Sequence, residues 1–134
     1  MRTFKNVILP ILITGIWINI SETVRWVLII ENYWIEKYDS LGLALPNETT
    51  NMIIWMVWGF LFATSIFILS KKFSVFQTTL LSWMMAFVMM WIVVWNVGVL
   101  PLEMLWINIP LSLLEAFIGA IICIKYLKNK NAST

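Results

Sequence analysis

The chain has 134 residues, of which 61% are hydrophobic and only 12% are charged, about half of the charged share that is usual in a soluble domain. This composition excludes an ordinary soluble globular protein and a disordered one. The net charge of +2 comes without a clustered basic face, so no nucleic acid is expected as a partner. Histidine is absent and there is a single cysteine, Cys123, which excludes histidine-ligated metals, histidine-based catalytic triads and an intrachain disulfide. We therefore expect an integral membrane protein with the lipid bilayer as its partner and with no metal or cofactor.

Four apolar stretches are each long enough to cross the hydrocarbon core of a bilayer, which takes about 20 helical residues. They comprise residues 7–30, 52–69, 76–100 and 105–127. The first stretch follows two basic residues, as in a signal peptide, but it is too long and lacks a small-residue cleavage site. The sequence therefore predicts an all-α integral membrane protein. Residues 1–134 are expected to form one domain, an up-down bundle of four transmembrane helices.

The connections between the stretches differ in length. Residues 31–51 form the only long connection, and we expect an external loop whose start, residues 33–38, lies at the membrane interface. The second span is the shortest, at 18 residues, so we expect its helix either to run nearly upright or to be extended and capped by residues 49–51. Asn108 is predicted to be the N-cap of the fourth helix, with Pro110 in its first turn.

Basic residues are unevenly distributed between the two ends of the predicted bundle. Seven of the nine lie at the end that would hold both termini: Arg2, Lys5, Lys71, Lys72, Lys125, Lys128 and Lys130. The opposite end carries Lys37 with the acidic residues Glu31, Glu36, Asp39, Glu48 and Glu103. Because the cytoplasmic flanks of membrane helices carry an excess of Lys and Arg, both termini are predicted to be cytoplasmic.

Polar side chains within the first span are candidates for a functional site, because unpaired polar groups at membrane depth are costly. Asn19, Glu22 and Arg25 follow one another at steps of three residues, a spacing that brings neighbours within reach on one helix. Glu22 and Arg25 can therefore pair directly. Such a pair is either a structural, self-neutralising ion pair or part of a ligand site.

The fourth span carries a polar stripe formed by Asn108, Ser112 and Glu115. At a rise of 1.5 Å per residue, Glu115 lies about 15 Å from Lys125, near the middle of the membrane. No basic residue stands at helical spacing above it. Its carboxyl is therefore either protonated or paired with a group on another helix, and it has either a functional role or a structural hydrogen bond.

The polar stripes of the first and fourth spans are expected to face each other, because these helices are antiparallel in the predicted topology. Asn19 and Glu22 lie at about the same depths as Ser112 and Asn108. This arrangement predicts one pocket in the outer half of the membrane, with Asn96 of the third span as a further contributor.

Most of the nine Trp residues map to the predicted outer half, where an interfacial aromatic belt is the ordinary explanation. Trp91 and Trp95 precede Asn96 at a spacing of four residues, which makes them candidates for the walls of the pocket. Carboxyl groups combined with aromatic faces suit an organic cation or an amphiphile with a polar head.

These observations predict a small polytopic membrane protein that binds or transports a small amphiphilic or cationic ligand. The candidate ligand-binding residues are Asn19, Glu22, Arg25, Trp91, Trp95, Asn96, Asn108, Ser112 and Glu115. Two alternatives stay open: an intramembrane enzyme that modifies a lipid or isoprenoid with a buried Glu as acid or base, and an accessory structural subunit of a membrane complex. No catalytic residue is assigned. A bundle of this size is also compatible with homo-oligomerisation.

Overall fold

The structure, a computed structural model, describes residue 1 and residues 4–132, with side chains up to residue 129. All regular elements in this part of the chain are helical. The α-helices are α1 (Leu9–Arg25), α2 (Glu31–Ser40), α3 (Thr49–Ser70), α4 (Val75–Trp83), α5 (Met89–Asn96) and α6 (Leu105–Ala132). Turns of π-helix cover Phe4–Ile8, Trp26–Ile30 and Met84–Val88, and a turn of 3-10 helix covers Leu102–Met104.

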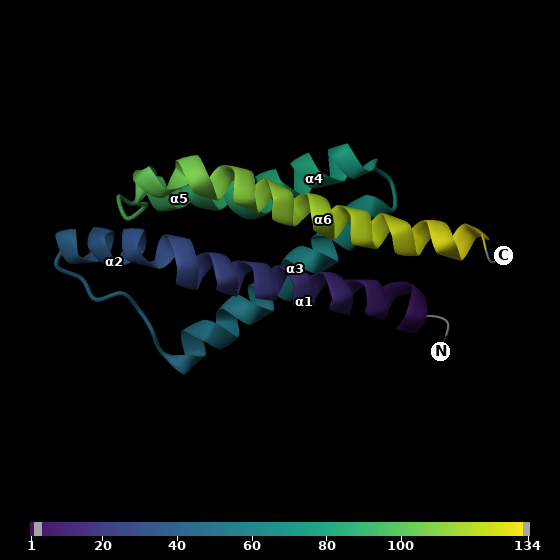
Figure 1. The fold of residues 1–134 in the computed structure, drawn as a ribbon, viewed down its shortest axis with the longest axis horizontal. Coiled ribbons are helices and arrows are strands. Elements are labelled where there is room, and N and C mark those ends of the chain that lie inside the picture. Colours follow the sequence, from purple (N-terminus) through teal and green to yellow (C-terminus); the bar gives the residue numbers. More distant parts are fainter. Residues whose placement is uncertain (2–3, 133–134) are drawn as a thin grey trace.

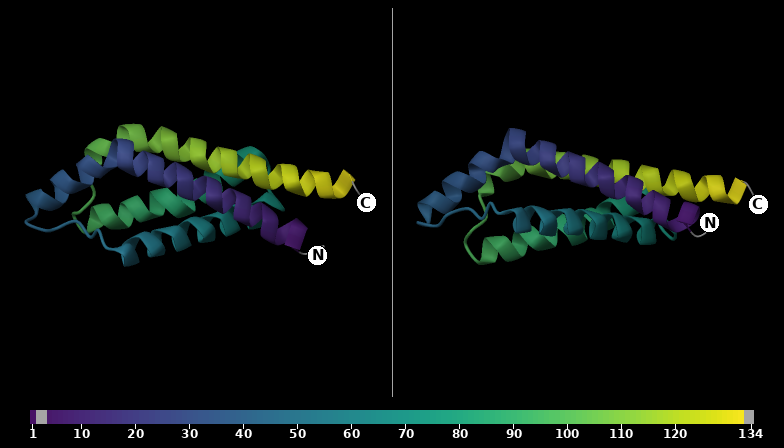
Figure 2. Two further views of the ribbon diagram at one scale, coloured as in Figure 1. Left: turned by 60° about the horizontal axis from the view of Figure 1, so that its bottom comes forward. Right: turned by 90° about the horizontal axis from the view of Figure 1, so that it is seen from below.

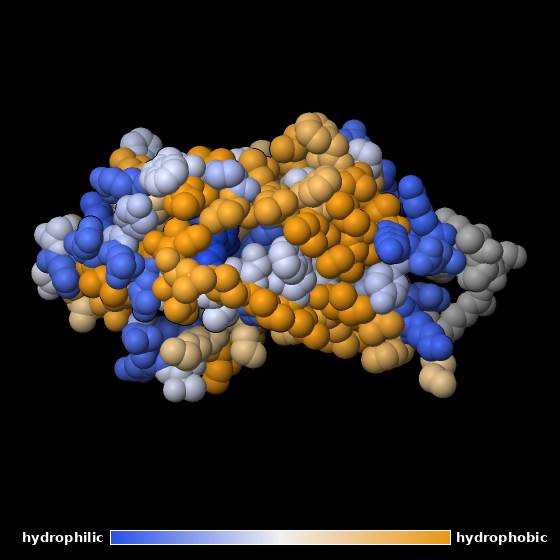
Figure 3. Space-filling model, viewed as in Figure 1, coloured by the Kyte–Doolittle hydropathy of each residue, from blue (hydrophilic) through white to orange (hydrophobic). Residues whose placement is uncertain are grey.

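These elements join into four continuous helices that are long enough and apolar enough to cross a membrane. They run over Phe4–Ser40, Thr49–Ser70, Val75–Asn96 and Leu102–Asn129. The prediction of an all-α chain with four helices of membrane length is therefore confirmed for the described residues. The visible surface is largely apolar between two hydrophilic ends (Figure 3), as expected for helices solvated by lipid tails.

The four long helices run alternately in opposite directions, so the start of the first and the end of α6 lie together (Figure 1). α1 and α6 lie side by side, α3 crosses α1, and α4 runs along α6 (Figures 1 and 2). We call the end with both chain termini the basic end, because it carries Lys5, Lys71, Lys72, Lys125 and Lys128. The opposite end, which holds the connections 41–48 and 97–101, is the loop end.

The first long helix continues ten residues beyond its predicted end at residue 30, because α2 adds a further segment. This corrects the predicted external loop, which shrinks to residues 41–48. Mixed aromatic and charged residues fit an interfacial helix as well as a loop. The helix bends at the π-helical turn Trp26–Ile30 (Figure 2). It ends where Gly42 adopts a φ of 69° and Leu43 donates its amide to the carbonyl of Tyr38.

The two predicted helix starts have different outcomes. α3 begins at Thr49, which agrees with the alternative in which residues 49–51 extend this helix. The side chain of Asn51 accepts a 3.0 Å hydrogen bond from the amide of Glu48. The prediction that Asn108 caps the fourth helix is wrong, because Asn108 lies inside α6. The 3-10 turn after Pro101 leads directly into α6 and gives the helix an earlier start.

Two glycines fix how α1 packs against α3. A Cβ atom on Gly15 would lie 2.3 Å from the ring of Phe60, and one on Gly59 would lie 2.6 Å from the side chain of Asn19. A side chain at Gly15 would therefore displace the ring of Phe60, and one at Gly59 would displace the side chain of Asn19. The face of α1 that includes Gly15 therefore packs against α3. The neighbouring face includes Thr14, which contacts Cys123 of α6.

Candidate functional site

Three ionisable side chains are buried together between α1 and α6. Glu22 and Arg25 belong to the last turn of α1, and Glu115 belongs to the middle of α6; their exposed fractions are 3%, 4% and 1%. Arg25 forms a hydrogen-bonded ion pair with Glu22 through Nη2. The same Nη2 atom lies 3.6 Å from Oε2 of Glu115. One guanidinium therefore stands between carboxyl groups from two helices, and we call these three residues the ionic cluster.

The third long helix closes the ionic cluster with an aromatic ring. The guanidinium carbon of Arg25 lies 5.2 Å from the ring centroid of Phe87, which belongs to the π-helical turn between α4 and α5. Phe87 in turn lies 5.5 Å from Trp58 and 5.7 Å from Trp91 between ring centroids. A cation over an aromatic face is attracted by the ring quadrupole, so Phe87 helps to hold Arg25 in place.

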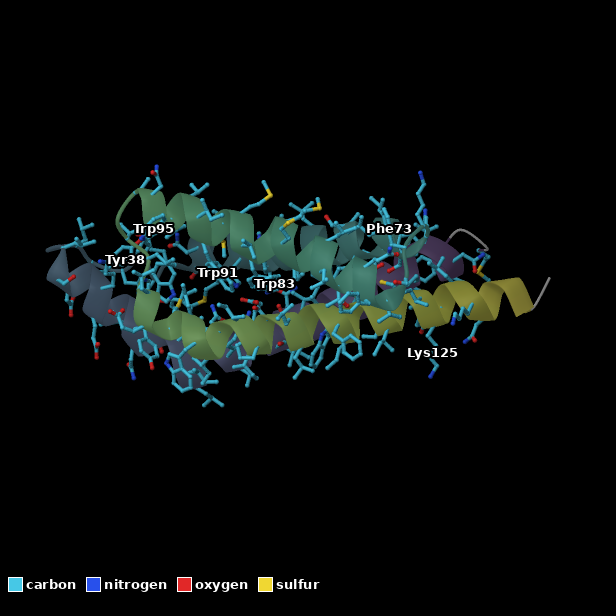
Figure 4. The ribbon with its side chains drawn as sticks, turned by 90° about the horizontal axis from the view of Figure 1, so that it is seen from above. Tyr38, Phe73, Trp83, Trp91, Trp95 and Lys125 are labelled. Atoms are coloured by element: carbon cyan, nitrogen blue, oxygen red, sulfur yellow. The ribbon has the colours of Figure 1, made fainter. Side chains whose placement is uncertain are left out.

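Trp83 connects α4 to the polar stripe of α6. Its indole Nε1 donates a 2.8 Å hydrogen bond to Oγ of Ser112, whose hydroxyl donates to the carbonyl of Ile109 at 3.0 Å. Figure 4 shows Trp83 and Trp91 between α6 and the helix that α4 and α5 form. Trp17 makes a similar link from α1, because its Nε1 donates to the backbone carbonyl of Glu115 at 3.1 Å. The polar stripe is thus tied to helices on both sides.

Several buried polar atoms around the ionic cluster have no hydrogen-bond partner among the described residues. They are Nε and Nη1 of Arg25, Oδ1 of Asn108, and both carboxyl oxygens of Glu115. Leaving such a group unpaired costs about 1–3 kcal/mol, and buried polar groups in native proteins are generally hydrogen-bonded. The site therefore holds donors and acceptors with unused hydrogen-bonding capacity, although Oε2 of Glu115 faces Nη2 of Arg25 at 3.6 Å.

The charges of the ionic cluster do not cancel. When Glu22, Arg25 and Glu115 are all ionised, the cluster carries one net negative charge. An uncompensated charge in a low-dielectric interior is costly. A proton or the cationic group of a ligand would balance it. In Figure 3, strongly hydrophilic atoms are visible at the bottom of a depression between the apolar surfaces of α1 and α6.

Of the nine predicted site residues, Glu22, Arg25 and Glu115 form this cluster. Ser112 lies one turn of α6 before Glu115, and Asn108 is buried on the same helix seven residues before Glu115. Trp91 contributes through its contact with Phe87 and lies 6.1 Å from Trp83 between ring centroids. Sequence reasoning missed Phe87 and Trp83. Both belong to an apolar run, in which no residue signals that its ring will meet a buried cation or serine.

The remaining three predicted residues lie apart from the cluster. Asn19 faces α3, where its Nδ2 donates to the carbonyls of Gly15 at 2.8 Å and Met56 at 3.5 Å. Helical geometry explains this, because six residues along a helix turn the side chain by about 120° away from Arg25. Trp95 is 61% exposed, and Asn96 is exposed at the last residue of α5.

Two cavities in the described structure lie at the ends of the bundle, and neither is lined by the ionic cluster. A cavity of about 360 Å³ at the loop end lies between α2 and residues 100–103, which precede α6, with Tyr33, Lys37 and Glu103 in its wall. A cavity of about 600 Å³ lies at the basic end.

Among the described residues, no three His, Cys, Asp or Glu side chains come together in a group that could hold a metal ion. Comparisons with protein-family models, with curated proteins and with solved structures give no match. Any conclusion about function therefore depends on the geometry and charge of the site itself.

Proposed function

We propose that the chain is a small polytopic membrane protein that binds or transports a small cationic amphiphile at the ionic cluster. The observation that carries this proposal is Glu115, a buried carboxyl whose ion-pair contact among the described residues is a single guanidinium nitrogen, Nη2 of Arg25, at 3.6 Å. It shares the single guanidinium of Arg25 with a second carboxyl, that of Glu22. An ammonium or other organic cation beside Glu115 would balance the charge and use these free acceptors.

The surrounding side chains give each part of such a ligand a suitable environment. Oδ1 of Asn108, which has no donor in the described structure, would accept a hydrogen bond from the cationic head. The aromatic rings of Phe87, Trp83 and Trp91 are adjacent to the cluster and suit a cation or an apolar body. The apolar tail would leave through the depression between α1 and α6, among the lipid chains.

Binding of tetraphenylphosphonium, a lipophilic cation, tests this proposal. We expect the purified protein in micelles to bind it in equilibrium dialysis, and Glu115→Gln to weaken binding about tenfold. This corresponds to about 1.4 kcal/mol, a modest value for losing one charge partner in a desolvated site. Glu103→Gln is the matched control, because Glu103 is an exposed glutamate at the loop end. This variant should bind tetraphenylphosphonium with the affinity of the parent protein.

Equal affinity of Glu115→Gln and the parent protein would contradict the ligand proposal. The carboxyl would then serve packing alone, and the alternative of an accessory subunit in a membrane complex would be favoured. Its signature would be a partner membrane protein that co-purifies with the chain in stoichiometric amount.

The orientation of the bundle is a second part of the proposal, with both termini on the cytoplasmic side. It rests on the lysines of the basic end, because cytoplasmic flanks carry the excess of basic residues. In a Cys123→Ser background, we expect Asn47→Cys to react with a membrane-impermeant maleimide added to intact cells. Lys72→Cys should react only after the membrane is permeabilised. The reverse pattern would overturn the orientation.

A further inference from the structure

The cavity at the basic end has the composition of a site for an anionic lipid. It has a volume of about 600 Å³ and lies between the α3–α4 turn and the last turns of α6. Its wall includes Lys71, Phe73, Ser74, Val75, Leu127 and Lys128. This volume falls within the range of about 300–1,000 Å³ that is typical of small-molecule sites.

We propose that this cavity binds one anionic phospholipid, with the phosphate near Lys71 and Lys128 and an acyl chain against the apolar wall. The site is separate from the ionic cluster, so the proposal does not rest on the proposed function. Basic pockets between membrane helices are known to suit the head groups of anionic lipids.

The charge at this end of the bundle is one-sided. Neither Lys71 nor Lys128 forms an ion pair among the described residues. All seven acidic residues lie in other parts of the fold: Glu22, Glu31, Glu36, Asp39, Glu48, Glu103 and Glu115. The ammonium of Lys71 lies 4.7 Å from the ring centroid of Phe67, which leaves its charge without a carboxylate partner. A phosphate diester would supply that partner from the ligand.

The start of α4 adds hydrogen-bond donors to the same cavity. Ser74 precedes the helix, and its Oγ accepts the amide of Gln77 at 3.3 Å. The hydroxyl hydrogen of Ser74 is therefore free to donate to an anion. The amide of Ser74 is taken by the side chain of Gln77, whereas the first-turn amide of Val75, a residue that lines the cavity, has no intrahelical acceptor. Free amides at a helix start favour a negative group.

The rest of the wall selects a lipid over a free phosphate ion. Phe73 of the α3–α4 turn, together with Val75, Ile124 and Leu127, gives the cavity an apolar side. Figure 4 shows Phe73 at the basic end of the bundle, as it does Lys125 of α6. Removing apolar surface from water lowers the free energy of the system. An acyl chain is therefore a better occupant of this side than water or an inorganic ion.

Native mass spectrometry of the full chain in micelles tests the proposal. The protein is mixed with equal amounts of phosphatidylglycerol and phosphatidylcholine that carry identical acyl chains. We expect one retained phosphatidylglycerol and about tenfold less phosphatidylcholine. The variant Lys71→Gln/Lys128→Gln should lose this preference. The matched control Lys72→Gln/Lys125→Gln removes the same charge from exposed positions at the same end that do not line the cavity, and it should keep the preference.

Each of the other outcomes overturns the proposal. Equal loss in the two double variants would show diffuse attraction to the basic end, and equal retention of both lipids would show a cavity without charge recognition. Release of phosphatidylglycerol by millimolar inorganic phosphate would assign the site to a free anion. Should Lys71→Gln/Lys128→Gln fail to fold by circular dichroism, Leu127→Trp serves instead, because it fills the apolar wall and keeps both lysines. The amount of phosphatidylglycerol retained by Leu127→Trp should be about tenfold lower than that retained by the parent protein.

Discussion

Replacing Arg25 with methionine is expected to lower the free energy of unfolding by about 3–5 kcal/mol, the usual cost of removing one partner from a buried ion pair. Methionine keeps most of the length and apolar stem of the side chain. It nevertheless leaves the carboxyl groups of Glu22 and Glu115 buried without the guanidinium that lies between them. The cation contact with Phe87 is lost as well.

The protein in mild micelles is titrated with SDS, and its unfolding is monitored by far-UV circular dichroism. Lys72→Met is the control, because Lys72 is exposed at the basic end, and it should change stability by less than about 0.5 kcal/mol. The triple variant Glu22→Gln/Arg25→Met/Glu115→Gln should recover much of the loss, since no charge stays buried. A loss below about 1 kcal/mol for Arg25→Met would mean that the guanidinium does not hold the cluster together.

Replacing Glu115 with leucine is expected to cost about 2 kcal/mol of stability, within the range for a buried polar group that loses its partner. The carboxyl lies 3.6 Å from Nη2 of Arg25, and leucine offers no acceptor there. Arg25 already has Nε and Nη1 without partners, so the guanidinium would depend on Glu22 alone. Glu115→Gln keeps the shape and one acceptor oxygen and should cost less than about 1 kcal/mol.

The same SDS titration measures the stability of the two variants and of the parent protein. The prediction is that Glu115→Leu is the least stable of the three and that Glu115→Gln lies between the other two. If Glu115→Leu is more stable than the parent protein, the uncompensated negative charge outweighs the contact with Arg25, and the prediction is contradicted. Glu115→Gln is also the variant used in the ligand assay. A folded, stable Glu115→Gln protein is therefore needed before any loss of binding can be assigned to the missing charge.

The parts of the fold that could be predicted from the sequence depend on local patterns. Length and hydropathy identify four membrane-length helices, and a spacing of three residues places Glu22 beside Arg25. The start of α3 at Thr49 follows from polar residues before an apolar run. The continuation of the first helix over residues 31–40 was not predicted, because its aromatic and charged side chains indicate an interface without distinguishing helix from loop.

The composition of the site depends on helix rotation and packing, which the sequence shows only in part. The pairing of Glu115 with a group on another helix was one of two open interpretations, and Arg25 fills that role in the structure. Counting 100° per residue would have placed Asn19 on a different face from Arg25. No such count could have found Phe87, because its position over the guanidinium depends on how the third long helix packs against α1.

The π-helical turn at Trp26–Ile30 shifts the phase of α2 relative to that of α1. A π turn accommodates one extra residue in a helix, and each residue corresponds to a rotation of about 100°. An unbroken α-helix through this region would therefore turn the side chains of Tyr33 and Lys37 away from the loop-end cavity that they line, while Arg25 kept its place. Inserting or deleting a residue within this turn would thus rotate α2 and change which of its side chains face the loop-end cavity. The buried charges of α1 would keep their positions.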